Sequence, residues 1–250
     1  MLHLLRRHAV PIRAHLRTSL VLAYALPAEI LRPLIGPGLE LDTFGNFGFL
    51  AVAMVETTEL RPAFLPRTAG LNFFLAGYRI FTRYRTTSGR SFRGLKILRS
   101  DTNRSSMCFF GNLLTHYGYE FAQVNTTRII SHYAIRIQSQ SGRADLQVEA
   151  DLTPGNESLP PGSPFATMQE ARKFAGPLPF TFDYEQQTRS MIRVEGVRSE
   201  WHPRPVPVTV HQNTFLQQPP FSHTDAILAN AFYLENVPYR WKPGVREPLP

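Results

Sequence analysis

Lysine is rare in this sequence, and one lysine lies where a reactive amine could be placed. Only three of the 27 basic residues are lysines: Lys96, Lys173 and Lys242. Lys96 stands in RGLKILR, a segment that alternation predicts as a strand with Phe92, Gly94 and Leu98 on the same face. Burial among apolar neighbours makes a lysine amine neutral and nucleophilic. In the more common arrangement the aliphatic stem lies on the sheet and the ammonium reaches water.

A second candidate, Arg79, interrupts an apolar segment. It lies in LAGYRIF, within a predicted strand that shares one face among Leu75, Gly77 and Arg79. A buried guanidinium needs a carboxylate partner or an anionic ligand. Glu56, at the end of the apolar AVAMVE segment, is the candidate partner. The pattern fits a structural ion pair and an anion-binding arginine equally well. We favour the ligand-binding role because of the family resemblance described below.

Two polar segments follow predicted elements. Asp101 and Asn103 lie in SDTNRSS directly after a predicted strand, where Asp and Asn suit turns and where loops also carry functional residues. In TMQEARKFAG, Thr167 precedes Glu170 by three residues, which is the spacing of a helix capping box. Arg172 lies on this helix, where a solvated position is the ordinary expectation and a reach into a cavity is the alternative.

The sequence lacks the common motifs of cofactor and metal enzymes. It has no HxxxH spacing, no GxSxG elbow, no phosphate-binding loop and no dinucleotide fingerprint, so we predict neither a metal nor a cofactor. The single cysteine, Cys108, lies among apolar residues in SMCFFGN and is expected to be a buried thiol. One cysteine excludes an internal disulfide and fits a reducing, cytoplasmic location.

Many short strands are predicted to position these residues. Strands and hairpins are expected at residues 13–26, 46–57, 72–99, 128–152 and 180–196, with turns at Ser88-Gly89 and Ser141-Gly142. In the 128–152 hairpin, one face is expected to carry Ile129, Ser131, Tyr133, Ile135 and Ile137. Helices are expected at residues 26–36 and 167–176. These elements predict a single α+β, mostly β domain over residues 1–250, built on a curved sheet or barrel, with a short basic arm at about residues 1–12.

Charge and motif content limit the classes of binding partner that are expected. The net charge is +8, which permits attraction to nucleic acid or to anionic lipid. The arginines are scattered, and the sequence has no helix-turn-helix, zinc or RNP-like pattern, so no nucleic acid partner is expected. No apolar run is long enough for a membrane-spanning helix. The sequence leaves the oligomeric state open.

The order of these segments resembles the bacterial DUF2071, or YqjF-like, proteins. The resemblance covers about residues 14–241 and rests on LELDTFGNFGFLAVAMVET, GYRIFTRYRTTSGRSFRGLKILRSDTNR, GSPFATMQEARKFAGPLPFTFDYE and VEGVRSEWHPRPVPV. This family is grouped with the acetoacetate decarboxylase-like superfamily, so the resemblance implies a curved, barrel-like sheet around a central cavity. Acetoacetate decarboxylases carry a lysine pair after a Gly-aromatic-Pro stretch. In HYGYEFAQV, Tyr119, Glu120 and Phe121 stand in those places, so decarboxylation by that route is not expected here.

Three functional hypotheses follow. In the favoured one, the cavity binds a small anionic or carbonyl-bearing molecule, with Arg79 and Lys96 as ligand contacts, Glu56 orienting Arg79, and Asn103 and Arg172 at the edge. In the second, Lys96 forms an imine with a keto or aldehyde substrate, and Glu56, Asp101 or Glu120 transfers protons. In the third, side chains fill the cavity and the basic surface binds a partner or a membrane.

Overall fold

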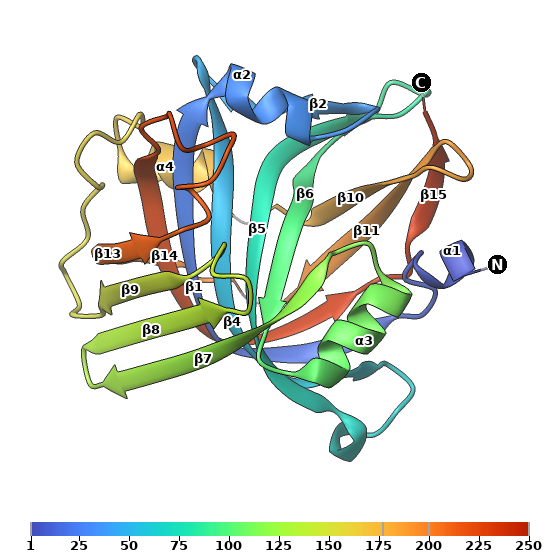
Figure 1. The fold of residues 1–250 in the computed structure, drawn as a ribbon, viewed down its shortest axis with the longest axis horizontal. Coiled ribbons are helices and arrows are strands. Elements are labelled where there is room, and N and C mark those ends of the chain that lie inside the picture. The colour runs from blue at the N-terminus through green and yellow to red at the C-terminus, as the bar shows by residue number, and fades with distance from the viewer. Residues whose placement is uncertain (1, 177, 200, 250) are drawn as a thin grey trace.

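The computed structural model describes residues 2–176, 178–199 and 201–249, and its described part is dominated by fifteen strands (Figure 1). The strands are β1 (Ile12–Pro27), β2 (Leu39–Leu41), β3 (Thr43–Phe44), β4 (Phe47–Pro62), β5 (Leu71–Arg85), β6 (Ser91–Thr102), β7 (Tyr119–Ile129), β8 (His132–Ser139), β9 (Leu146–Asp151), β10 (Phe180–Glu185), β11 (Ser190–Arg198), β12 (Arg204–Pro205), β13 (Val208–Asn213), β14 (Ile227–Trp241) and β15 (Val245–Pro248). The α-helices are α1 (Leu2–Leu5), α2 (Ala28–Leu31), α3 (Ser105–Leu114) and α4 (Met168–Phe174), and short 3₁₀ turns lie at Arg32–Leu34 and Arg67–Ala69.

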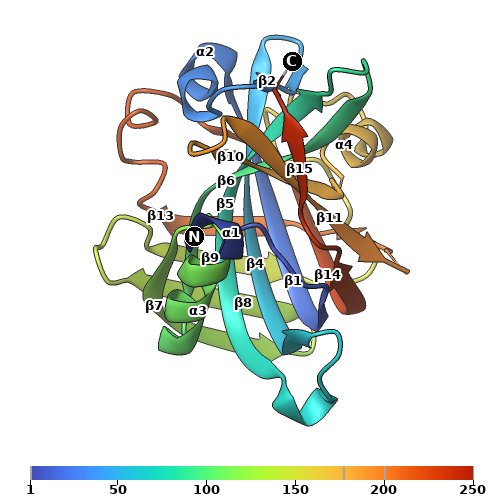
Figure 2. The same cartoon turned by 90° about the vertical axis from the view of Figure 1, so that its right-hand side faces the viewer.

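Seven strands form a curved, ring-like sheet. Hydrogen-bonded pairs join β6 to β10, β10 to β11, β11 to β14, β14 to β1, β1 to β4, β4 to β5 and β5 back to β6. All these pairs are antiparallel except β6 with β10. Figure 2 shows the long strands β1, β4 and β5 beside one another. The predicted mostly β fold with a curved sheet is confirmed.

A second layer branches from the ring at β6. β7 pairs with the far end of β6, and the sheet continues through β8 and β9 to β13. Apolar side chains of β8 and β9 pack on the even-numbered face of β5, where Tyr78 and Ile80 are fully buried. The odd-numbered face of β5, which carries Arg79, therefore points away from this layer.

Local sequence explains the elements that hold the site. The β4 segment from Gly48 to Val55 is buried throughout, as its continuous apolar run predicted. The β5–β6 hairpin turns at residues 86–90, where Gly89 has a φ of +81° that a glycine adopts without strain. The α4 cap is also confirmed, because Thr167 Oγ1 accepts a hydrogen bond of 3.1 Å from the Glu170 amide.

One predicted hairpin begins later than expected. Arg128 and Ile129 end β7 rather than opening the next strand, and the chain turns before His132 starts β8. Ile129 is consequently 62% exposed instead of sharing the buried face of Tyr133. Alternation along one continuous strand gave the wrong face here, because the two-residue turn pairs Ile129 with His132 and so places Ile129 on the face opposite Tyr133.

The basic arm packs onto the ring. Arg7 donates hydrogen bonds of 2.7 and 2.5 Å to the two carboxylate oxygens of the fully buried Glu185 on β10. The His8 ring contacts Tyr117, with 6.1 Å between the ring centroids. α1 lies beside α3 (Figure 2). The arm therefore covers the region where β10 and β7 diverge.

Candidate functional site

Arg79 is a deeply placed cation without a carboxylate partner. Its Nε is buried and has no hydrogen-bond partner among the described residues. The guanidinium lies against the backbone of Gly77, where an added side-chain carbon would come within 2.8 Å of Nε. Burial lowers the pKa of Arg79, while Tyr239, Tyr119 and Tyr117 raise it. A glycine on the same face therefore makes room for the guanidinium, and aromatic hydroxyls rather than acids surround it.

Three tyrosines from separate segments form the surroundings of Arg79, and we call these four residues the Arg79 cluster. Tyr119 lies on β7, Tyr239 on β14, and Tyr117 directly before β7. Burial raises the pKa of Tyr119 to about 12 and also raises the pKa values of Tyr117 and Tyr239. All three phenols are therefore neutral near pH 7 and can donate hydrogen bonds.

A partly buried ion pair lies next to the cluster. Lys96 Nζ donates a hydrogen bond of 2.8 Å to Asp183 Oδ1. Burial raises the pKa of Asp183 to about 6, although Lys96 lowers it. Tyr117 connects the pair to the cluster, since its hydroxyl lies 2.9 Å from Thr181 Oγ1 and its pKa responds to both Asp183 and Arg79. The sequence left two alternatives for Lys96, a reactive amine and an ammonium that reaches water, and in the structure its amine contacts a carboxylate.

The structure separates Glu56 from Arg79, which corrects the predicted pairing. Glu56 pairs across the sheet with Thr18 and Phe74, and its carboxylate lies 3.2 Å from Arg17 Nη1. Arg79 lies on the opposite face of β5 from Phe74, because even and odd residues alternate across the sheet. Glu56 therefore does not orient Arg79.

Asp101, Glu120 and Asn103 belong to a different environment. Arg99 contacts both acids, with 2.8 Å to Asp101 Oδ1 and 2.8 Å to Glu120 Oε2. Burial raises the pKa of Asp101, while its hydrogen bond to Arg99 lowers it. Asn103 Oδ1 accepts a hydrogen bond of 2.8 Å from the Phe74 amide and so closes the end of the β5–β6 pairing. The two acids face the even-numbered side of the sheet, away from Arg79.

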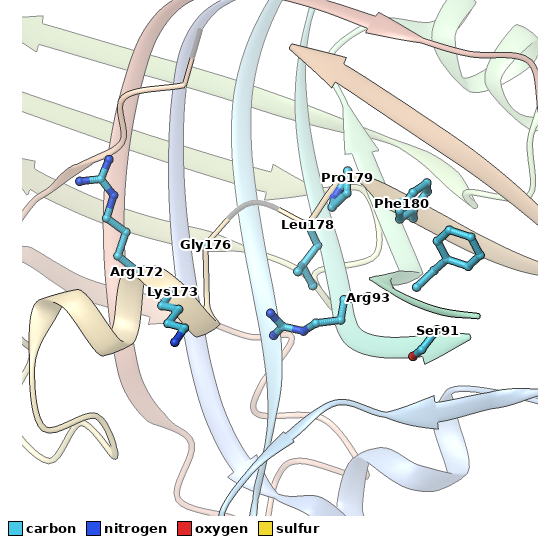
Figure 3. A pocket seen from close by; sticks show the side chains of 9 residues that line it. Ser91, Arg93, Arg172, Lys173, Gly176, Leu178, Pro179 and Phe180 are labelled. Atoms are coloured by element: carbon cyan, nitrogen blue, oxygen red, sulfur yellow. The ribbon is translucent and has the colours of Figure 1, made fainter. Parts of the chain in front are cut away.

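Arg172 lines a surface hollow rather than the interior (Figure 3). This hollow of about 350 Å³ is also lined by Arg93, Lys173 and Phe180. Arg93 donates a 2.6 Å hydrogen bond to the buried Asp42 and another, of 2.9 Å, to the Phe174 carbonyl. Figure 3 shows Arg172 directed away from Arg93, so the structure does not bring Arg172 together with Lys96 or Arg79.

Sequence reasoning overlooked Asp183 and the three tyrosines. A signal was present for Asp183, because FTFDYE places an acid between aromatic residues in a predicted strand. Tyr117 and Tyr239 gave no signal, since a tyrosine in a β-rich sequence ordinarily indicates core packing. Only the closure of the ring, together with the branching of β7 from β6, brings β14 and β7 to the same arginine.

The described residues contain neither a metal-binding cluster nor a membrane-spanning helix. Within residues 2–176, 178–199 and 201–249, no group of three or more His, Cys, Asp and Glu side chains could hold a metal ion. None of the helices in this described part has the length and apolar character needed to cross a membrane.

Comparison with solved structures identifies the fold. An acetoacetate decarboxylase from Legionella pneumophila has a TM-score of 0.60 and 9% identity over 95% of this chain and 87% of its own. An acetoacetate decarboxylase-like enzyme from Sphingomonas wittichii RW1 has a TM-score of 0.57 and 14% identity over 98% and 96%. The enduracididine biosynthesis enzyme MppR, complexed with pyruvate, has a TM-score of 0.58 and 10% identity over 95% and 90%. At these identities the similarity establishes the fold alone.

Sequence comparison gives the family. No curated protein matches the chain significantly. The family model DUF2071, described as an uncharacterized conserved protein, matches residues 13–238, which is nearly the whole chain. The chain therefore belongs to the DUF2071 family and has the fold of acetoacetate decarboxylase-like proteins.

Proposed function

We propose that this protein binds a small carboxylate or other carbonyl-bearing anion at the Arg79 cluster. The observation that supports this proposal is the buried Nε of Arg79, which has no hydrogen-bond partner among the described residues. A buried charge without a partner is costly, and removal of one partner from a buried ion pair costs about 3–5 kcal/mol. A bound anion would supply the missing partner. Its binding would therefore offset the cost of burying the Arg79 charge.

The partial exposure of Arg79 supports the same proposal. The Arg79 side chain keeps an intermediate accessible surface although burial lowers its pKa. A side chain that is partly accessible and whose pKa is nevertheless lowered by burial is expected beside an internal space that small molecules reach. The neutral hydroxyls of Tyr117, Tyr119 and Tyr239 are suited to the second oxygen of a carboxylate or to a neighbouring carbonyl.

The fold comparison agrees with this ligand class. One neighbour of the same fold is complexed with pyruvate, which carries both a carboxylate and a carbonyl. We use pyruvate as the first probe for this reason.

Titration calorimetry with pyruvate, acetate and methylamine tests the proposal. Wild-type protein is expected to bind the two carboxylates and not the amine. Because a hydrogen bond to a charged group contributes about 1.5–3 kcal/mol, Arg79→Gln should weaken binding roughly 10- to 150-fold. Arg172→Gln is the matched control, since this exposed arginine lines the surface hollow, and it should bind like the wild type. Unchanged binding by Arg79→Gln would refute the proposed site.

The imine hypothesis for Lys96 has a separate test. Lys96 Nζ donates a hydrogen bond to Asp183 Oδ1, and an attack on a carbonyl would require the amine to leave this contact. Borohydride treatment with pyruvate, followed by peptide mass mapping, is expected to give no selective adduct at Lys96 over Lys173 and Lys242. Saturable labelling of Lys96 would favour the imine enzyme instead.

The basic-surface hypothesis has one supporting observation, the hollow of Figure 3 with Arg93, Arg172 and Lys173 in its lining. It predicts binding to a polyanion that weakens steeply as salt rises. Binding to heparin at 50 and 300 mM salt measures this dependence, and carboxylate binding that survives 300 mM salt separates the two sites.

A further inference from the structure

Asp183 lies where two strands share one edge of β6. β10 pairs with β6 up to Lys96, and β7 pairs with the same edge from Ser100 onward. β5 occupies the other edge of β6 throughout. Figure 1 shows β10 and β7 diverging from β6 at this point. The short edge between the two pairings is therefore a place where the sheet opens and side chains from β6, β7 and β10 converge.

Asp183 and Arg79 lie on the same face of the sheet. Leu95 pairs with Phe81 of β5 and with Thr181 of β10, so Thr181 shares the odd-numbered face of β5. Asp183 is two residues beyond Thr181 and keeps this face. β6 alone separates β5 from β10 as far as the Lys96–Phe182 pair, where the two outer strands lie about 10 Å apart at ordinary strand spacing.

The two oxygens of Asp183 have different environments. Oδ1 accepts the hydrogen bond from Lys96, whereas Oδ2 accepts none from the described residues. The side chain is 7% exposed. One oxygen is thus fixed in orientation and the other is available, which is the arrangement that a proton-transfer group needs.

Tyr117 interacts electrostatically with both charged groups. Its hydroxyl lies 2.9 Å from Thr181 Oγ1, and its pKa is raised by burial and by Asp183 and lowered by Arg79. A neutral tyrosine here can donate a hydrogen bond to a ligand carbonyl oxygen while Arg79 holds the carboxylate.

We propose that Asp183 exchanges a proton at the carbon next to the carbonyl of a 2-oxo acid held by Arg79. This inference rests on the proposed function. The Asp183 carboxylate takes the proton, the C–H electron pair forms a carbon–carbon double bond, and the carbonyl π pair moves to an enolate oxygen that accepts a hydrogen bond from Tyr117. The reverse steps return a proton to carbon after Asp183 has exchanged its own with solvent. No oxidant, reductant or second substrate is consumed.

Lys96 acts in this scheme as a positioning residue. It fixes Oδ1 and lowers the pKa of Asp183, in opposition to burial, so that the acid titrates near pH 6. The charged and titratable groups around the pair come from the arm, from the segment before β7, from β5 and from β10 itself: Arg6, Arg7, His8, His116, Tyr117, Arg79 and Glu185. The Lys96 and Asp183 variants separate the contribution of Asp183 to the pH dependence of exchange from the contributions of these other groups.

Deuterium incorporation into pyruvate tests the inference. The methyl proton signal of pyruvate in D₂O is followed by NMR, and binding is measured in parallel with trimethylpyruvate, which has no exchangeable proton on that carbon. Wild-type protein is expected to accelerate exchange above buffer, with a rate that rises through about pH 6. Asp183→Asn should lower this exchange about 10²- to 10⁴-fold and keep trimethylpyruvate binding. Asp225→Asn, an exposed acid far along the chain, is the matched control and should leave both unchanged.

The outcomes separate the inference from the proposed function. Absence of trimethylpyruvate binding by the wild type refutes the proposed function. Binding with exchange no faster than in buffer, or undiminished exchange by Asp183→Asn, overturns the role of Asp183 alone. If Asp183→Asn does not fold, Lys96→Met tests the role of Asp183 instead. This variant should still exchange deuterium into pyruvate, with the midpoint of the pH dependence of the rate moved to higher pH. Complete loss of exchange in folded Lys96→Met would instead indicate an imine on Lys96.

Discussion

Lys96 Nζ and Asp183 Oδ1 lie 2.8 Å apart, and this contact joins β6 to β10 at the last residue of their parallel pairing. Beyond it, β10 leaves the edge of β6 and β7 takes its place. The pair therefore fixes the point at which the ring and the second layer separate. It also places a carboxylate near the buried Arg79 without neutralising that arginine.

Replacement of Arg79 by methionine should stabilise the protein while removing ligand binding. The Nε of Arg79 is buried without a hydrogen-bond partner among the described residues, and replacement of buried charges by apolar side chains of similar volume often stabilises proteins by about 1–4 kcal/mol. Urea unfolding at pH 7 measures the change, and calorimetry measures pyruvate binding. The matched variant Arg99→Met should destabilise, since Arg99 pairs with Asp101. A destabilised Arg79→Met would indicate a structural role for Arg79.

Asp183 should make stability fall as pH rises. Its pKa in the folded protein is raised from 3.8 to about 6, so the folded state binds the proton more tightly than the unfolded state. This stabilisation is fully present below pH 3.8 and is lost as pH rises to about 6, a change of roughly 3 kcal/mol. Asp183→Asn should therefore gain stability relative to the wild type between pH 4 and pH 6.5 in urea titrations. A constant difference across this range would contradict the prediction.

His8 should act in the opposite direction in nearly the same pH range. Burial lowers its pKa from 6.5 to about 4, so the unfolded state binds the proton more tightly. The contribution of neutral His8 is present above pH 6.5 and is lost as pH falls to about 4. His8→Phe, which keeps a ring against Tyr117, should lose this dependence and become relatively more stable at low pH. The exposed His223→Phe serves as the comparison and should follow the wild-type pH curve.

Release of the N-terminal arm should follow from loss of Arg7. Arg7→Gln leaves the fully buried Glu185 without its guanidinium, and we expect a loss of about 2 kcal/mol, since Arg7 itself is partly exposed. Limited proteolysis should then cut within residues 2–10 faster than in the wild type. Arg6→Gln changes an exposed neighbour and should leave the cleavage rate unchanged. Equal cleavage rates in both variants would mean that the ion pair does not hold the arm.

The cap of α4 should contribute a measurable share of stability. Thr167 Oγ1 accepts the Glu170 amide proton, and loss of such a cap costs about 1 kcal/mol. Thr167→Ala should lower the free energy of unfolding by that amount, whereas Gln169→Ala, on the exposed surface of the same helix, should not. Thr167→Ser should restore most of the loss.

Local sequence was sufficient for the elements that depend on local physics. The hairpin of β5 and β6, the buried β4 and the cap of α4 follow from alternation, a continuous apolar run and a Thr-to-Glu spacing. These patterns act over a few residues, so they can be read without knowing the neighbours in space. The same reasoning marked Arg79 as a cation in an apolar strand that needs a partner.

The partner of that cation was decided by the tertiary structure. Glu56 looked suitable because it ended a neighbouring strand, but the sheet register places it on the other face with Arg17. Asp183 and Tyr239 come from β10 and β14, far along the chain, and the closure of the ring brings them near β5 and β6. Strand order and register are set by the burial of whole faces rather than by any one segment. The sequence by itself therefore determined which side chain is anomalous, and only the assembled sheet determined which groups surround it.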